Sequence, residues 1–191
     1  GKILKNGKEV AIRNPNDANA LGIGMVHQHF KLVECFSVLD NIILGVEPNK
    51  MGFLQKAEAR KKVMALSEKY GLRVDPDALI SDISVGMQQR VEILKMLYRD
   101  NEILIFDEPT AVLTPQESDT LMQFIRDFTK QGNSVIFITH KMKEVMQAAD
   151  RIVVMRAGIV VDALEKADAT ESLLARLMIG QDVEPEHRPA P

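Results

Sequence analysis

Two short apolar segments that end in reactive side chains constrain this chain more than any other feature. Ile103–Phe106 is a run of four apolar residues followed directly by Asp107 and Glu108, and Val135–Thr139 leads into His140. A short, continuously apolar run is typical of a strand buried on both faces, as in a parallel sheet. Because open α/β sheets bind ligands at the carboxyl ends of their strands, we expect these carboxylates and this imidazole to lie where chemistry is done.

The segment Ser84–Gln88 adds a possible phosphate site. Ser84 is placed to cap a helix, which is often its only role, but Gly86 two residues later lets a ligand approach the backbone closely. The start of a helix carries the positive end of its dipole and binds phosphate readily. Combined with the acidic pair, this segment predicts a nucleotide hydrolase. Asp107 is then expected to hold Mg²⁺ through water, and Glu108 to orient or deprotonate the water that attacks a terminal phosphate.

The order of predicted elements indicates an α/β fold. Strands and helices alternate from residue 102 onward, which is the pattern of a parallel sheet with right-handed crossovers. Residues 46–100 show helical spacing, with no convincing strand between 52 and 102, and are predicted to form an inserted helical subdomain. The domain is predicted to extend over residues 1–180, followed by a linker or disordered tail at 181–191, which holds three prolines.

Turn and capping signals predict several local elements. Asn6-Gly7 and Ala157-Gly158 predict hairpins, and Thr114 with Glu117 three residues later predicts a helix start. Further elements are expected at these positions: a helical turn at 17–21, a strand at 23–27, a helix capped by Ser37 at 37–45, a strand at 134–139 and a helix at 170–179.

Composition excludes some classes of function. The chain has 24 Lys and Arg against 27 Asp and Glu, giving a net charge of −3, so a nucleic-acid partner is not expected. Cys35 is the single cysteine, which rules out an internal disulfide and fits a reducing compartment. No apolar stretch approaches the ~18–20 residues that span a bilayer.

These segments, in this order, resemble the ATP-binding cassette of membrane transporters. In that family the stretch matching Ile83–Arg90 is the signature loop, the one matching Ile103–Glu108 is the Walker B strand, and the D-loop falls at 111–114. Gln28 falls at the Q-loop glutamine and His140 at the switch histidine. The resemblance is closest to importers of simple sugars and nucleosides, through the segments 22–30, 84–97 and 109–117. Two cassettes are usually fused in those importers.

The resemblance implies cofactors, residue roles and partners. ATP and Mg²⁺ would be the cofactors, with Glu108 and His140 catalytic, Asp107 and Gln28 on the metal side, and Gln28 also touching the membrane partner. Nucleotide contacts are expected from Gln28, Ser84, Gly86 and Gln88, with the Ser84 helix end offered to the nucleotide of a second cassette. The partners would be integral-membrane permease subunits and that second cassette, fused or separate, with an indirect link to a solute-binding protein. The expected location is the cytoplasmic face of the cell membrane.

The chain also departs from the commonest family pattern. Val85, Met87 and Thr114 replace the usual Gly, Gln and Asp, as happens in the sugar and nucleoside branch. More seriously, no Gly-x-x-x-x-Gly-Lys-Ser/Thr loop (Walker A) is present, and Gly1-Lys2 is no remnant of one because Ile3 follows. We therefore expect a cassette fragment that lacks its first strand, which would lie beside the 103–107 strand, and its first helix. Such an isolated chain is expected to bind ATP weakly and to be inactive.

Two other functions compete with an importer ATPase. A non-catalytic cassette remnant that serves only as an interaction module would explain the missing Walker A loop, although Glu108 and His140 argue for an active parent. A soluble cassette ATPase of DNA maintenance would need a long coiled coil between Gln28 and Ser84, and the sequence there shows no sustained heptads.

Overall fold

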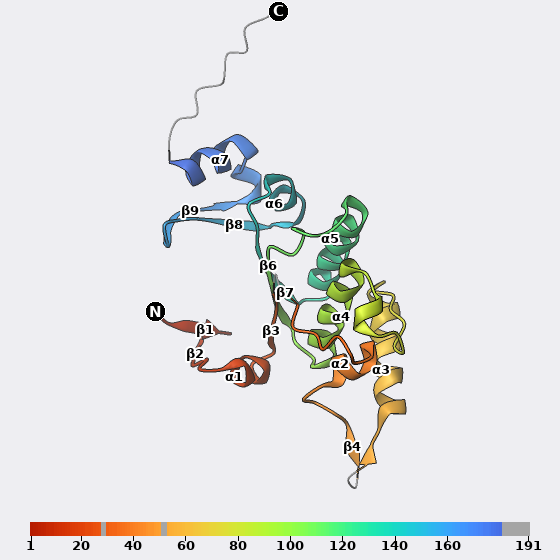
Figure 1. Cartoon of the computed structure of the whole chain (residues 1–191). Coiled ribbons are helices and arrows are strands. Elements are labelled where there is room, and N and C mark those ends of the chain that lie inside the picture. The colour runs from red at the N-terminus through yellow and green to blue at the C-terminus, as the bar shows by residue number, and fades with distance from the viewer. Residues whose placement is uncertain (28–29, 51–52, 181–191) are drawn as a thin grey trace, which may run out of the picture. The chain divides into compact units, whose positions relative to one another are not determined.

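The computed structural model describes residues 1–27, 30–50 and 53–180 (Figure 1). The chain divides into two compact units, Gly1–Ile138 and Thr139–Pro191, and each is described by itself. Within the described ranges, no helix has both the length and the apolar character needed to cross a bilayer. The prediction of a single domain over 1–180 remains a prediction.

The first unit contains most of the secondary structure. Its elements, in chain order, are β1 (Ile3–Lys5), β2 (Lys8–Val10), α1 (Pro15–Ala20), β3 (Ile23–Val26), α2 (Val38–Ile43), β4 (Asn49–Lys50), β5 (Phe53–Leu54), α3 (Lys56–Lys69), the 3₁₀ turn η1 (Ile80–Asp82), α4 (Val85–Tyr98), β6 (Ile103–Asp107), α5 (Pro115–Lys130) and β7 (Ser134–Ile138).

A three-stranded parallel sheet forms the centre of the first unit. Its strand order is β3-β6-β7, with Leu104 of β6 opposite Gly24 on one side and Val135 on the other. The parallel sheet predicted from the apolar runs is therefore confirmed. Both edges of β6 are already paired, so a further strand could not join the sheet beside it. That expectation was wrong, and the edges left unpaired in the described residues belong to β3 and β7.

One face of this sheet is covered far better than the other. Leu104 and Phe106 are fully buried, and the Phe106 ring lies 6.4 Å from the ring of Phe124 on α5. On the opposite face of β7, Ile136 and Ile138 remain 52% and 47% exposed. The prediction of burial on both faces is thus wrong for β7, whereas Ile103 and Ile105 of β6 are partly buried. An apolar run gives the hydrophobicity of both faces of a strand, but not which face another element covers.

Aromatic side chains on the covered face of the sheet connect the end of α3 with β6 and α5. Tyr70, just after α3, lies 5.5 Å from the ring of Phe124 and 6.0 Å from that of Phe128. Phe124 and Phe128 are stacked at 5.5 Å, one helical turn apart on α5. This aromatic cluster links Tyr70 to α5 and to the central strand of the sheet.

The helices α2, α3 and α4 pack together (Figure 1), and a separate helical subdomain over residues 46–100 stays a prediction. Ser37 caps α2 by accepting a hydrogen bond from the backbone N–H of Asp40 at 3.1 Å, as expected. One expectation fails, because β5, which forms a two-residue antiparallel pair with β4, lies in the region predicted to hold no strand. A pairing this short leaves no periodic signal in the sequence.

The second unit has its own small core. Its elements are α6 (Met142–Ala148), β8 (Arg151–Arg156), β9 (Ile159–Glu165), the 3₁₀ turn η2 (Lys166–Asp168) and α7 (Glu171–Ile179). The β8–β9 hairpin turns at Ala157 and Gly158, both of which have positive φ, as predicted. Ile152, Val154 and Leu174 are buried between the hairpin and α7.

The predicted capping box at the start of α5 is confirmed. Thr114 accepts from the N–H of Glu117 at 3.3 Å, and the Glu117 carboxylate accepts from the N–H of Thr114 at 2.9 Å. These hydrogen bonds from Thr114, with a smaller contribution from the charge of Arg90, hold the pKa of Glu117 below its ordinary value.

This lowered pKa predicts an acid-dependent loss of stability. The stabilisation is complete above the ordinary carboxyl pKa of about 4.3 and is lost as the pH falls through the lower folded-state value. Glu117→Gln removes the titration, so its melting temperature should fall less than that of the wild type between pH 6 and pH 3. Thermal unfolding followed by circular dichroism measures this difference, and parallel pH profiles would contradict it.

Candidate functional site

The predicted acidic pair lies at the carboxyl end of the central strand. Asp107 is the last residue of β6 and pairs with Ile138, and Glu108 follows it; both side chains are partly buried. The backbone N–H of Glu108 donates to the carbonyl of Ile138 at 2.9 Å. The structure therefore places both carboxylates at the carboxyl end of the parallel strands, where ligands bind in α/β folds.

Glu108 adopts an unusual backbone conformation. Its φ of 45° lies in the left-handed region, which is disfavoured for residues other than glycine. Such conformations cost of order 1–3 kcal/mol, cluster at functional sites and persist where the surrounding structure fixes them. The turn that follows is closed by the N–H of Ala111, which donates to the carbonyl of Glu108 at 3.2 Å. The strained turn marks the carboxyl end of the central strand as the best candidate site.

Ser84 begins α4, as the sequence predicts. It is exposed, and its hydroxyl accepts from the N–H of Met87 at 3.3 Å. Gly86 is buried, and a Cβ atom added to it would overlap the Glu117 carboxylate on α5. The close approach at Gly86 is therefore made by α5 in this structure, although we expected a ligand there. Nucleotide contacts by Ser84 and Gly86 stay predictions.

Gln88 has a structural partner within its own segment. Its amide Nε2 donates to the carbonyl of Ile80 at 3.3 Å and lies 3.5 Å from that of Ile83. These bonds tie the first turn of α4 to η1, which directly precedes it. The structure thus gives Gln88 a role in fixing the start of α4, and its predicted contact with nucleotide stays untested.

Two further predicted site residues lie outside the described part of the first unit. His140 is exposed and belongs to the second unit, so its contribution to the same site stays a prediction. The turn that carries it is braced by Thr139, whose hydroxyl donates to Glu144 at 3.1 Å and accepts from the N–H of Lys141 at 3.0 Å. Gln28 lies outside the described residues.

Sequence reasoning missed one polar residue at this site. Gln89 is only 3% exposed, and its Nε2 donates to the carbonyl of Pro109, the residue after Glu108, at 2.6 Å. A signal was present, because Gln89 shares a helix face with Gly86 and Ile93, where apolar residues are expected. A polar side chain in such a stripe needs a buried partner.

The acidic pair fits Mg²⁺ only in combination with a nucleotide. Within the described ranges, no group of three or more His, Cys, Asp or Glu residues is arranged to hold a metal ion. Mg²⁺ keeps several waters and is usually bound through one or two carboxylates plus substrate phosphates. Asp107 suits that arrangement, since it supplies one partly buried carboxylate at the carboxyl end of the central strand.

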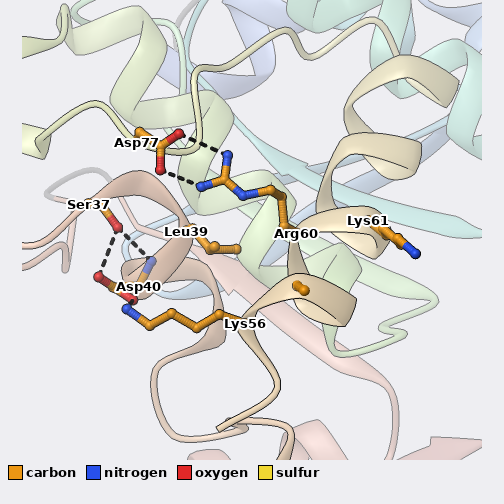
Figure 2. Close-up of a pocket in the computed structure, with 8 residues that line it drawn as sticks. Ser37, Leu39, Asp40, Lys56, Arg60, Lys61 and Asp77 are labelled. Atoms are coloured by element: carbon orange, nitrogen blue, oxygen red, sulfur yellow. Dashed lines mark hydrogen bonds and ion pairs between the residues drawn. The ribbon is translucent and has the colours of Figure 1, made fainter.

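A hollow lies elsewhere in the described part of the first unit. It has a volume of about 590 Å³ and lies between α2, α3 and the segment before η1 (Figure 2). Lys56 contacts Asp40 at 2.7 Å across it, and Arg60 pairs with Asp77. These partners lower the pKa of both carboxylates, chiefly through their hydrogen bonds. Lys56 and Arg60 are thus paired within the chain, and none of the predicted site residues lines the hollow.

Comparison with known proteins agrees with this arrangement. Residues 1–111 match the family model described as ABC transporter. The chain is 56% identical to the nucleoside import ATP-binding protein NupA of Lactococcus lactis and 53% identical to the guanosine import ATP-binding protein NupO of Bacillus subtilis, each over 183 residues. Both alignments cover 96% of this chain but 36% of the relative. The chain thus spans about a third of the length of these relatives.

Solved structures show the same fold. The ATP-binding cassette MJ0796, in a dimer bound to ADP and Pi, superposes with a TM-score of 0.71. The match has 22% sequence identity and covers 87% of this chain and 73% of that one. The predicted architecture, a cassette-like α/β fold with a parallel sheet, is confirmed by this likeness.

Proposed function

This chain belongs to the ABC transporter family, and from that premise we propose that it energises the import of a nucleoside or a simple sugar by hydrolysing ATP. The observation that carries the proposal is the position of Asp107 and Glu108 at the carboxyl end of the central parallel strand. A nucleoside is the preferred solute, because the relatives with 56% and 53% identity are named for nucleoside and guanosine import.

The side chains suit the steps of phosphate hydrolysis. Bound Mg²⁺-ATP supplies the terminal phosphate and its charge-neutralising metal ion. Asp107 would hold the metal ion, and Glu108 would take a proton from the attacking water. His140 would contact the terminal phosphate, and Gln28 would sense the metal ion and water. Hydrolysis depends on how well these groups are oriented, which is why the fixed turn at Glu108 supports the proposal.

The partners follow from the same proposal. Ser84 and Gly86 at the start of α4 would face the nucleotide of a second cassette, because a helix start favours phosphate. Integral-membrane permease subunits would carry the solute, with a solute-binding protein acting indirectly, and the chain would lie on the cytoplasmic face of the membrane. No nucleic-acid partner is proposed, in keeping with the net charge of −3.

The two competing functions have less support. The family match and the names of the relatives favour an ATPase over a remnant that only binds partners. The DNA-maintenance class needs a long coiled coil, whereas the helices α2 and α3 between 30 and 84 have 6 and 14 residues.

The solute class is tested by its effect on ATP hydrolysis. The assembled importer that contains this chain is reconstituted into vesicles with its permease and binding protein, and phosphate release is measured with guanosine or with ribose. Guanosine is expected to raise the rate of phosphate release, because closure of the two cassettes should depend on a permease that has received its solute. Stimulation by ribose alone would shift the proposal to sugars, and absence of ATP hydrolysis with either solute would contradict it.

A further inference from the structure

Gln89 connects α4 to the turn that carries Glu108. Its side chain is 3% exposed and donates to the carbonyl of Pro109 at 2.6 Å. Burying an amide costs free energy unless the amide finds a hydrogen-bond partner. Gln89 meets that need at the Pro109–Thr110 peptide bond, the second peptide bond after Glu108. The contact joins two segments that are twenty residues apart in the sequence.

The conformation of Glu108 depends on support from outside its own turn. Its φ of 45° is unfavourable for a residue with a side chain. The backbone bonds to Ile138 at 2.9 Å and from Ala111 at 3.2 Å fix the two sides of the Glu108 residue itself. The bond from Gln89 fixes the next carbonyl and comes from a different helix. Together these contacts hold the disfavoured conformation in place.

We propose that Gln89 is a positioning residue that holds the Glu108 carboxylate in its reactive direction. The inference rests on the proposed function, because it assigns Gln89 a role in the hydrolysis performed by Glu108. Gln89 lies on the same helix as Ser84, one turn and a half further on. A shift of the start of α4 would therefore reach the Glu108 turn through this one hydrogen bond, and the position of α4 would set the rate of hydrolysis.

Gln89→Met removes the donor and keeps the length of the side chain. In the assembled importer we expect kcat for ATP hydrolysis to fall by about 10- to 100-fold, the order of effect of a small misplacement of a catalytic group. KM for ATP should stay unchanged, because Gln89 is buried and its amide is directed at the Pro109 carbonyl. Gln89→Asn, which withdraws the amide by one methylene, is a second variant in case the first does not fold, and it should show the same selective loss.

A matched control separates positioning from general destabilisation. Ser67 is equally buried, and its hydroxyl donates to the carbonyl of Leu72 at 2.8 Å, within the α3 region. Ser67→Ala thus also removes a buried side-chain donor from a backbone carbonyl. It should lower the melting temperature while leaving kcat unchanged. In a Glu108→Gln background, Gln89→Met should cause no further loss of single-turnover hydrolysis, since the group that it positions is already disabled.

Amide hydrogen exchange tests the inference without ATP hydrolysis. The amides of Glu108 and Ala111 should exchange faster in Gln89→Met than in Ser67→Ala, measured by NMR on the chain. In an active importer, an unchanged kcat, or an equal loss in the wild-type and Glu108→Gln backgrounds, would overturn the inference. An importer that hydrolyses no ATP would overturn the proposed function instead. In that case the amide exchange rates test the role of Gln89 alone. Equal exchange rates of the Glu108 and Ala111 amides in Gln89→Met and Ser67→Ala would overturn that role.

Discussion

Replacing Glu108 by glutamine in the assembled importer is expected to lower ATP hydrolysis by about 10²- to 10⁴-fold, the range typical of lost general-base catalysis. The amide keeps the shape of the side chain but loses its basicity and charge. ATP binding should be spared, because Glu108 acts on the attacking water. Glutamine and glutamate meet the same steric limits at the left-handed φ of position 108, so the variant is expected to keep this turn and the effect to report chemistry.

The measurement has to follow each nucleotide site separately, because a second cassette could sustain turnover. Single-turnover hydrolysis, with phosphate release assigned to each site, meets this need. Glu58→Gln is the matched control, since it makes the same chemical change at an exposed position on α3. The control should leave turnover unchanged, whereas near-normal turnover in Glu108→Gln would show that Glu108 is not the base.

Phe124→Ala is expected to lower the free energy of unfolding by about 3–5 kcal/mol, the cost of truncating a buried Phe. The ring of Phe124 contacts those of Tyr70, Phe106 and Phe128, so its removal leaves a cavity where three elements meet. A whole domain has a net stability of only about 5–15 kcal/mol, so this single change removes a large part of it.

Chemical denaturation of the chain gives the change in unfolding free energy directly. Val112→Ala removes apolar atoms at an exposed position of the same unit and should change it by less than about 0.5 kcal/mol. A loss below about 1 kcal/mol in Phe124→Ala would show that the aromatic cluster contributes little to the stability of the core.

Local sequence signals predicted the secondary structure well. The capping box at Thr114, the cap at Ser37 and the hairpin at Ala157-Gly158 all depend on neighbouring residues, and the structure confirms each. The exposed face of β7 was not predictable in this way. Ile136 and Ile138 have the same character as buried strand residues, and their exposure depends on which face α5 covers.

The candidate site likewise has a part that could be predicted from the sequence and a part that could not. Asp107 and Glu108 were placed by a general rule of parallel sheets, and the structure bears out that placement. The bond from Gln89 to Pro109 and the packing of Glu117 against Gly86 join separate helices and turns, so no local pattern contained them. Tertiary contacts of this kind assign structural roles that a motif alone does not reveal.

Simultaneous measurement of phosphate release and solute uptake tests the proposed function most directly. Vesicles that hold the assembled importer receive labelled guanosine on the side of the membrane where the binding protein lies. Mg²⁺-ATP is supplied on the opposite side, where the cassettes lie. In the wild type, uptake should rise in step with phosphate release, and Glu108→Gln should lower uptake together with phosphate release from its own nucleotide site. Uptake that continues at the wild-type rate when Glu108→Gln has stopped hydrolysis would contradict the proposal that this chain energises import through Glu108.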